Sequence, residues 1–517
     1  MSFDYVVVGA GAAGCVLANR LSVDPGVSVL LVERGGRGRD PRLAVPRAFV
    51  FTMRSPRHTL RYPTRSGEGV PPEAWLRGQG LGGSTLVNGL MYVHGDERDY
   101  DDLESVVGDG WGPSDFARAF ADMESGLLGV TVPKEGDDVS EAVIAGAVAV
   151  GLRRVADVNR SAGDRIGYTP ATTSRGRRVS AATAFLRPAR RRPNVTVVTG
   201  SVVERIEMTD GRATGVVLRD RAGVRTVEAC REVLLCAGTI ESPAILERSG
   251  IGGAEALRAA GIPRVVDSPR VGEGVVEHRG LSLQVRFRDR RGVTERLNTR
   301  PRQVREGLRY LATRQGPVAT SGYDVASRFT SDPTSTAPDA HGVWVPMAID
   351  ETATELGLAP YSGLLFTGYA TRPTSGGSTH VASADPSALP VITPRHLEDA
   401  AEQRTTAGIL AHARQVVDAS GLASHVASEV FPGPHLVEPA DVVEHVRAHG
   451  GGIYHAVGSC AAGRDEGAVL DTDLRVRGVE GLRVVDASAF PHHVSGNTAA
   501  PVMALAWLAA ERIVLPG

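Results

Sequence analysis

Two apolar runs near the N-terminus predict buried β-strands. Residues 4–8 and 27–32 are largely apolar, and the glycine-rich stretch 9–14 directly follows the first run. Short apolar runs bounded by glycine are typical of strands in a parallel sheet, and clustered glycines allow a tight turn into a helix. The N-terminus is therefore predicted to form a strand, a turn, a helix and a second strand that ends at Glu33.

The C-terminal part of the chain shows a related pattern. An apolar run ends at Asp486, and the apolar segment 501–514 predicts a helix with Asn497 or Thr498 as its N-terminal cap. The start of a helix exposes N–H groups that together resemble about half a positive charge. Such an end is a favourable neighbour for a cofactor that becomes negative on reduction.

The middle of the chain changes from helical to strand-like patterns. Helical patterns occupy residues from about 104 to 152, with one helix beginning at Pro113 and another over 139–150. Strand patterns separated by turns follow at 281–285, 342–346, 363–369 and 379–381. One more helical pattern covers residues 400–420.

These patterns predict an α/β fold with two domains. The first is expected to be Rossmann-like, with a mostly parallel sheet, and to combine residues 1–285 with 450–517. It includes an expected lid at about 36–74, rich in proline and arginine. The second, residues 286–449, is expected to be an α+β substrate domain with an antiparallel sheet. Residues 332–339 are the best candidate for a mobile loop.

The N-terminal glycines carry the first chemical signal. In a strand–helix–strand context, Gly9 allows the turn, Gly11 lets the backbone approach a pyrophosphate, and Gly14 lets the helix pack on the strand. Glu33 lies about 20 residues further on, where a carboxylate can bind ribose hydroxyls. The motif predicts an adenine dinucleotide but does not distinguish FAD from NAD.

Composition narrows the class of partner. The chain has 517 residues, 42% of them hydrophobic, and a net charge of −2, so no overall field favours nucleic acid or an anionic membrane. No secretory leader precedes the first strand, and no apolar run approaches the ~20 residues of a membrane span. We therefore expect a cytoplasmic protein.

Cysteine and histidine spacings predict neither disulfides nor a metal site. The four cysteines form no CxxC pair, and only Cys460 lies close enough to a candidate active-site residue to be watched for oxidation. The scattered histidines show no metal spacing, and surface positions are the simplest account of them: His278, His412, His425, His435, His445 and His449.

Further glycine-rich segments extend the dinucleotide signal into a family resemblance. Residues 77–92 contain Gly80-Leu81-Gly82-Gly83-Ser84, and residues 237–252 follow a predicted strand with a tight turn and a short helix. Together with residues 478–501, these segments resemble the glucose–methanol–choline (GMC) oxidoreductase family over essentially the whole chain, most weakly at 286–449. The resemblance implies bound FAD, a two-domain fold, and hydride transfer from an alcohol-type carbon to flavin N5.

The resemblance also assigns roles to residues. His455 falls where the family has its active-site histidine, and Asn497 where it has the partner of that histidine. Val87 lies in the loop where some members attach the flavin through a histidine, so we expect FAD to be held without a covalent bond. The cofactor-binding residues implied or predicted are Gly9, Gly11, Ala12, Ala13, Gly14, Glu33, Arg34, Gly82, Gly83, Ser84, Asn88, Gly89, Met91, Val203, Ala237, Gly238, Asp486, Ala487, Asn497 and Thr498.

Several positions depart from the family pattern. Residues 271–278 read Val-Gly-Glu-Gly-Val-Val-Glu-His where the family often has VGxNLxDH, and His94 replaces a common arginine. Glu277 could tune the pKa of a neighbour or form a structural ion pair. His492 and His493 precede the active-site turn, where solvent exposure or a backbone hydrogen bond is the simpler expectation. These departures leave the substrate open.

The chemistry itself favours a histidine base. Oxidising an alcohol needs a hydride acceptor and a group that takes the hydroxyl proton, and the ordinary pKa of histidine lies near neutrality. We therefore predict FAD-dependent oxidation of a small-molecule alcohol, with oxygen or another electron acceptor regenerating the cofactor. A non-redox lyase or decarboxylase on the same scaffold, and a non-catalytic FAD-binding protein, are the alternatives.

Overall fold

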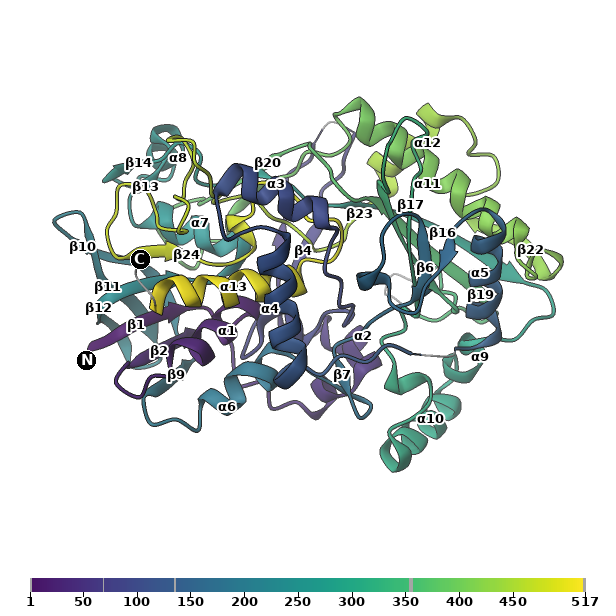
Figure 1. The fold of residues 1–517 in the computed structure, drawn as a ribbon, viewed down its shortest axis with the longest axis horizontal. Helices are drawn as coiled ribbons and strands as arrows, with labels where there is room; N and C mark the ends of the chain where they lie inside the picture. Colours follow the sequence, from purple (N-terminus) through teal and green to yellow (C-terminus); the bar gives the residue numbers. More distant parts are fainter. Residues whose placement is uncertain (1, 68, 134–135, 353–356, 515–517) are drawn as a thin grey trace.

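The computed structural model describes residues 2–67, 69–133, 136–352 and 357–514, and its two large sheets lie side by side (Figure 1). The first has seven strands in the order β10-β11-β12-β1-β2-β9, with β24 beside β12. β1, β2, β9, β24 and the end of β12 run parallel, while β10, β11 and β12 form an antiparallel edge. The strands are β1 Ser2–Val8, β2 Val29–Glu33, β9 Val195–Thr199, β10 Val202–Thr209, β11 Arg212–Asp220, β12 Gly223–Leu235 and β24 Leu482–Val484.

Helices from both ends of the chain pack beside this sheet. α1 (Ala12–Leu21) contacts α13 (Ala499–Val514), which in turn contacts α4 (Pro113–Gly126) (Figure 1). A Cβ atom on Gly14 would lie 1.9 Å from the carbonyl oxygen of Gly9, so α1 can approach the β1 turn this closely only with glycine there. α13 is buried along most of its length, and each fully buried aliphatic side chain contributes about 1.5–3 kcal/mol.

The second sheet has eight strands in the order β22-β16-β19-β18-β17-β6-β5, with β23 beside β16. All its pairings are antiparallel except β5 with β6. α5 (Asp138–Ala149), α11 (Ala400–Ala419) and α12 (Pro439–His449) pack against it through one apolar cluster. Its strands are β5 Arg153–Arg154, β6 Arg165–Tyr168, β16 Arg279–Phe287, β17 Val325–Phe329, β18 Ala340–Val345, β19 Gly363–Ala370, β22 Val426–Phe431 and β23 Gly451–Gly452.

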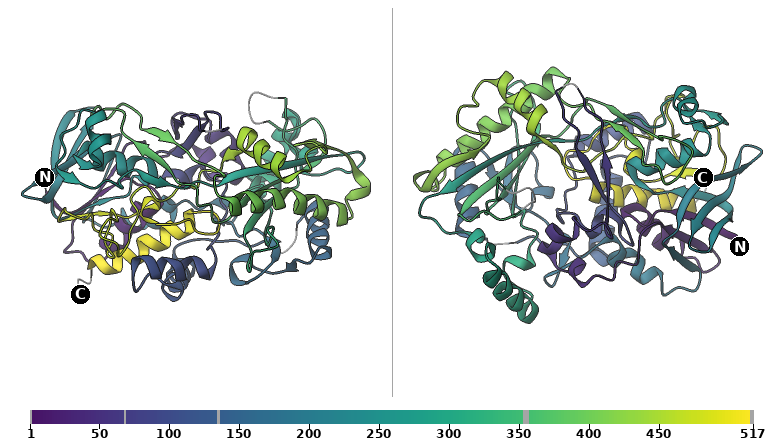
Figure 2. Two further views of the ribbon diagram at one scale, coloured as in Figure 1. Left: turned by 90° about the horizontal axis from the view of Figure 1, so that it is seen from above. Right: turned by 180° about the vertical axis from the view of Figure 1, so that it is seen from behind.

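The smaller elements surround these two layers (Figure 2). The helices are α2 Phe49–Thr52, α3 Glu97–Val107, α6 Arg187–Ala189, α7 Gly238–Arg248, α8 Ala254–Ala259, α9 Val293–Leu297 and α10 Arg300–Thr313. The strands are β3 Thr59–Pro63, β4 Ala74–Gly78, β7 Thr173–Ser174, β8 Arg177–Arg178, β13 Ile251–Gly252, β14 Val266–Asp267, β15 Glu273–Val275, β20 Gly377–His380 and β21 Val391–Thr393.

The predicted fold class is confirmed, with a mostly parallel sheet beside an antiparallel one. The predicted helices and strands of the middle region are present within a few residues of their expected bounds. At α13, the N–H of Val502 donates to the carbonyl of Thr498, which places the cap at Thr498. The domain boundary at residue 285 stays a prediction, and β5, β6 and α5, from the N-terminal side of it, pack with the second sheet.

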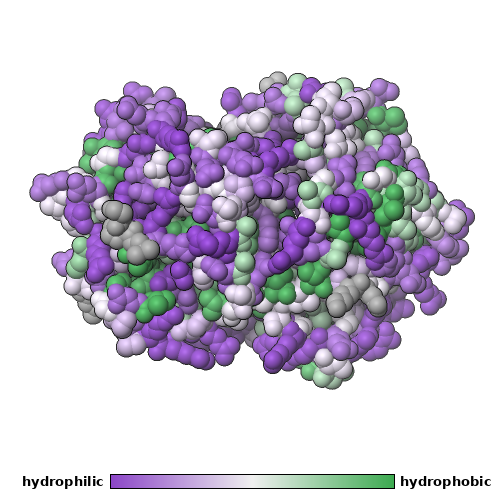
Figure 3. All heavy atoms as spheres, viewed as in Figure 1, coloured by the Kyte–Doolittle hydropathy of each residue, from purple (hydrophilic) through white to green (hydrophobic). Residues whose placement is uncertain are grey.

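The expected mobility of one segment stays a prediction. Residues 332–339, predicted as a mobile loop, form a turn held by the carboxylate of Asp339, which accepts hydrogen bonds from the N–H groups of Ser331 and Asp332 at 2.7 and 3.0 Å. The carboxylate of Asp332 also accepts from the N–H and the hydroxyl of Thr334, so side chains rather than regular secondary structure hold this turn. The surface drawn in Figure 3 is mostly hydrophilic with smaller hydrophobic areas.

Candidate active site

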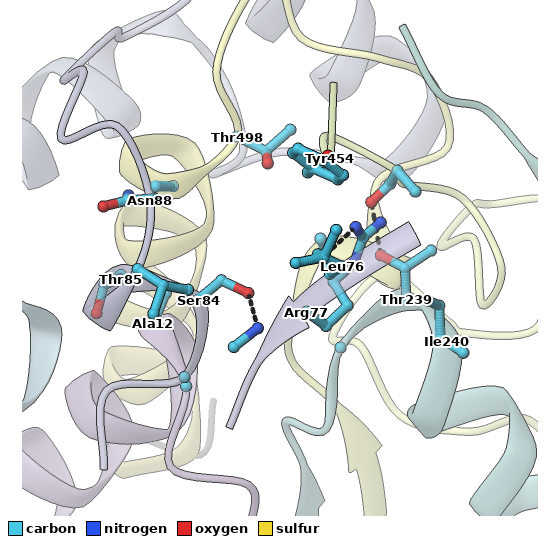
Figure 4. Close-up of a pocket in the computed structure, with 18 of the residues that line it drawn as sticks. Ala12, Leu76, Arg77, Ser84, Thr85, Asn88, Thr239, Ile240, Tyr454 and Thr498 are labelled. Carbon is cyan, nitrogen blue, oxygen red and sulfur yellow. Dashed lines mark hydrogen bonds between the residues drawn. The ribbon is translucent and has the colours of Figure 1, made fainter. Parts of the chain in front are cut away.

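A cavity of about 590 Å³ is lined by residues from both sheets. Figure 4 shows part of its wall, with labelled residues from α1, β4 and α7. One part of its wall comes from the C-terminal ends of β1 and β2 and the start of α1. The opposite part comes from β16, β18 and β19 of the second sheet, and from residues 451–456. A cavity of this size is in the range of small-molecule and cofactor sites.

The start of α1 is open to the cavity. Gly11 is its N-cap residue and provides no side chain to bond the first N–H groups, which have no partner within the helix. A Cβ atom on Gly11 would meet only the carbonyl oxygen of Cys236, at 3.9 Å. These N–H groups and the positive end of the helix dipole together form a binding site for an anion such as a pyrophosphate.

Glu33 joins three backbone segments at this end of the cavity. Its carboxylate accepts hydrogen bonds from the N–H groups of Ala10 (2.9 Å), Gly35 (2.8 Å) and Gly80 (2.9 Å). Burial raises the pKa of Glu33, while these three N–H donors oppose that rise. A carboxylate has about four acceptor positions, so one is left for a further donor such as a ribose hydroxyl.

Asp486 has the corresponding role at the start of α7. It accepts from the N–H of Gly238 at 2.8 Å and the hydroxyl of Ser242 at 2.6 Å. Gly238 has a φ of 89°, and a Cβ atom there would meet nothing within 4 Å. Two distant turns are thus held together by one buried carboxylate beside the cavity.

His455 and Asn497 meet at the cavity wall. Nδ2 of Asn497 lies 2.9 Å from Nε2 of His455, and Nδ1 of His455 lies 3.1 Å from Nδ1 of His278. Burial, and then the nearby His493 and Arg77, hold the pKa of His455 well below its usual range. Its imidazole is therefore neutral near pH 7 and can accept a proton.

Glu277 positions the backbone around His455. Its carboxylate accepts from the N–H groups of His455 (2.6 Å) and Ala456 (3.0 Å), and Arg77 lies 3.6 Å away. Burial raises the pKa of Glu277 to about 7, although Arg77 and the two N–H groups oppose that rise. Tyr454 has a φ of 69°, which is rare for a bulky residue and reverses the chain direction just before His455.

The prediction that His278 is a surface residue is wrong. Its side chain is fully buried between β16 and β19, with Nε2 3.0 Å from the carbonyl oxygen of Thr371. The imidazole also packs on Tyr369 and His493. Sequence spacing misplaced it because its contacts come from segments about 90, 180 and 215 residues away along the chain. The other histidines in that list are exposed or half-buried.

Comparison with known proteins places the chain in a family. Two family models described as GMC oxidoreductase match residues 3–279 and residues 373–506, respectively. The chain belongs to the GMC oxidoreductase family. The resemblance proposed from the sequence is therefore confirmed, and the chain is an FAD-dependent enzyme of the GMC type.

Named relatives span the whole chain. A Pseudomonas putida protein named alcohol dehydrogenase (acceptor) is 30% identical, over 99% of this chain and 96% of the relative. The oxygen-dependent choline dehydrogenase of Paraburkholderia phymatum is 33% identical, over 99% and 92%. Pyridoxine 4-oxidase from Mesorbium loti has a TM-score of 0.88 at 27% identity, covering 99% of both chains. A formate oxidase of Aspergillus oryzae, at 23% identity and a TM-score of 0.90, shares the fold.

The cavity fits the FAD of a GMC oxidoreductase. The open start of α1 matches a pyrophosphate, and the remaining acceptor position of Glu33 matches a ribose hydroxyl. The open space at Gly238 lets a cofactor chain approach the backbone closely. Val87 lines the same cavity, and a valine side chain cannot form a covalent link to the flavin. Non-covalent binding stays a prediction.

Most predicted site residues come together at this cavity, although their individual roles stay predictions. Two of them do not line it. Gly14 lies behind the turn and serves the packing of α1, and Gly82 has a φ of 116° and donates its N–H to the carbonyl of Ala10 at 2.7 Å. The residues that line it are Gly9, Gly11, Ala12, Ala13, Glu33, Arg34, Gly83, Ser84, Asn88, Gly89, Met91, Val203, Ala237, Gly238, His455, Asp486, Ala487, Asn497 and Thr498.

Of the wall opposite the dinucleotide end, sequence reasoning indicated Tyr323 and Tyr369 as candidate substrate-domain aromatics and missed the other residues. The lining residues contributed by the second sheet and the loop before β17 are Gly280, Ser282, Tyr323, Val343, Thr367 and Tyr369. The sequence signal available for them was alternation: Gly280 and Ser282 point to one face of β16, and Thr367 and Tyr369 to one face of β19. Alternation does not indicate which face meets a cofactor.

Three other histidines have local structural roles or lie away from the cavity lining. His493 is buried and its Nδ1 bonds the carbonyl of Val494 at 2.8 Å, which confirms the expected backbone hydrogen bond. His94 contacts Glu124 at 2.8 Å and stacks on Phe120. His492 is half-buried and does not line the cavity.

Cys460 is fully buried, and burial raises the pKa of its thiol, so it is poorly placed for oxidation.

Proposed function

We propose that this protein oxidises an uncharged alcohol to an aldehyde or ketone, with His455 as the base that takes the hydroxyl proton. The observation that carries this proposal is the His455–Asn497 pair, whose side chains meet 2.9 Å apart at the wall of a cavity that also holds the dinucleotide-binding turns. When bound, FAD supplies the hydride acceptor at its N5 atom.

The proton acceptor is Nε2 of His455. A base must approach a hydroxyl to about 3 Å, and His455 lines the cavity beside Asn497, so a bound alcohol can reach it. Asn497 can orient the same hydroxyl, because its amide carries both donors and an acceptor and its Oδ1 has no hydrogen-bond partner among the described residues. The lowered pKa of His455 keeps its ring neutral at neutral pH, and Nε2 carries a lone pair that accepts from Nδ2 of Asn497.

The opposite wall supports an uncharged substrate. The lining residues contributed by the second sheet carry no ionised group, and Ser282 and Thr367 lie with their hydroxyls 3.1 Å apart. A buried cation is best paired with a carboxylate, and the lining carboxylates, Glu33, Glu241 and Asp486, are already bonded to neighbouring protein groups. Neutral alcohols that carry a second hydrogen-bonding group match this wall.

The test is anaerobic flavin reduction followed by absorbance. His455→Ala should lower the reduction rate by on the order of 10²–10⁴-fold while FAD stays bound, because general-base catalysis contributes that much. His425→Ala, a half-exposed histidine bonded to Asp289, is the matched control and should reduce at the wild-type rate.

An unchanged rate in His455→Ala would remove this residue from the chemistry. Product formation without any bleaching of the flavin would favour a lyase or decarboxylase. The screen should pair neutral primary and secondary alcohols with choline, and faster reduction by choline would refute the uncharged-substrate proposal. Admitting air afterwards distinguishes oxygen from another electron acceptor.

A further inference from the structure

His278 is buried directly behind His455. Its side chain has no exposed surface, and its two ring nitrogens have different partners. Nε2 lies 3.0 Å from the carbonyl oxygen of Thr371, and Nδ1 lies 3.1 Å from Nδ1 of His455. The mechanism proposed above does not use this residue.

The partners determine where the protons are. A carbonyl oxygen can only accept, so Nε2 of His278 carries a hydrogen. Burial, together with His493, His455 and His341, holds the pKa of His278 well below its usual range, so the ring is neutral and its Nδ1 has none. The contact between the two Nδ1 atoms then requires the hydrogen on His455.

This assignment leaves one basic nitrogen on His455. With its hydrogen on Nδ1, the neutral ring has its lone pair on Nε2, toward Asn497 and the cavity. The opposite tautomer would place a hydrogen on Nε2 and leave two bare Nδ1 atoms 3.1 Å apart. That arrangement loses a buried hydrogen bond and removes the proton acceptor.

Two other roles for His278 are inconsistent with the contacts. A proton relay would need an acceptor beyond Thr371, but the contact there is a backbone carbonyl, which does not take up a proton. A metal site would need converging ligands, and the described residues contain no group of three or more His, Cys, Asp or Glu that could hold an ion.

We propose that His278 is a positioning residue that holds His455 in the tautomer with hydrogen on Nδ1, so that Nε2 is the nitrogen presented to the alcohol. This inference rests on the proposed function, in which Nε2 takes the proton. The side chains facing the pair are Asn497, His493, His341, Tyr369, Glu277 and Arg77.

Two substitutions of similar polarity test the role of the acceptor. An asparagine side chain places its oxygen near the position of Nδ1, whereas a glutamine side chain reaches the position of Nε2. His278→Asn therefore retains an acceptor for His455, and His278→Gln retains only the contact with Thr371. We expect flavin reduction within about threefold of wild type for the asparagine variant and a loss of roughly 10²-fold for the glutamine variant, within the range of general-base catalysis.

Histidine-selective ¹⁵N labelling gives a readout that does not depend on turnover. Protonated and bare ring nitrogens have distinct ¹⁵N shifts, and the His455→Ala variant identifies the signals of that ring. Wild type and His278→Asn should show His455 with hydrogen on Nδ1, and His278→Gln should show Nε2 carrying at least part of it. FAD content should be equal in all variants, because His278 does not line the cavity.

The outcomes separate this inference from the proposed function. Equal reduction rates in the two His278 variants, or a wild-type spectrum with hydrogen on Nε2 of His455, would refute the positioning role while leaving His455 as the base. A wild-type rate in His455→Ala would refute the proposed function, and the spectra would still decide the tautomer. Should one His278 variant fail to fold, the reduction rate and ¹⁵N spectrum of the other variant, each compared with wild type, decide the role of His278.

Discussion

Replacing Glu277 by alanine should loosen the loop that carries His455. The wild-type carboxylate accepts from the N–H groups of His455 and Ala456 at 2.6 and 3.0 Å, and it is 1% exposed. Alanine leaves both donors without a partner in a site that is largely closed to water. Each such buried donor costs roughly 1–3 kcal/mol, so the two together weaken the local structure by about 2–6 kcal/mol.

The pH at which the comparison is made changes the magnitude. The pKa of Glu277 rises from 4.5 to about 7, which corresponds to roughly 3 kcal/mol. A carboxyl group whose pKa is higher in the folded state than in the unfolded state stabilises the folded state at pH values below its unfolded-state pKa. That stabilisation is lost as the pH rises through the folded-state pKa. The effect of Glu277→Ala should therefore be largest near pH 5 and smaller at pH 8.

Hydrogen exchange of residues 453–457 measures this local effect without assuming two-state unfolding of a large protein. Near pH 5, the alanine variant should lose protection in that segment by roughly 30-fold to 10⁴-fold, since every 1.4 kcal/mol is a factor of ten. Glu273→Ala is the matched control, because Glu273 lies close to Glu277 along the chain but has an exposed side chain. A change of less than about threefold in Glu277→Ala near pH 5 would refute the reasoning.

Two further predictions concern pH and the N-terminal turn. Glu277→Gln should flatten the fall in stability between pH 5 and pH 8 relative to wild type, because the titrating group is gone; parallel slopes in denaturant unfolding would contradict this. Gly11→Ala should fold but bind FAD at least about tenfold more weakly, which FAD titration measures. Gly14→Ala should fail to fold, because its Cβ atom would lie 1.9 Å from the carbonyl oxygen of Gly9. Circular dichroism distinguishes the folded variant from the unfolded one. Equal FAD affinity in Gly11→Ala and wild type would remove Gly11 from the binding site.

Among the described residues, no helix has the length and apolar character needed to cross a bilayer.

The amino-acid sequence by itself determined the parts of this protein whose physical causes are local. The strand before Gly9, the turn and the start of α1 follow from apolar runs, from the positive φ of Gly9 and from the close approach at Gly14, and these requirements act within a few residues. The family motifs further indicated that residue 455 and residue 497 meet, and the structure brings them to 2.9 Å.

Tertiary structure alone decided the surroundings of the base. Neither the burial of His278 nor the link from Glu277 to His455 could be predicted, because each depends on segments that are distant along the chain and meet only when β16, β19 and the 451–456 loop pack together. The hydrogen on one imidazole nitrogen is assigned by a carbonyl at Thr371, 84 residues before His455 in the sequence. Burial and hydrogen-bond partners are properties of the packed chain, so residue spacing alone does not specify them.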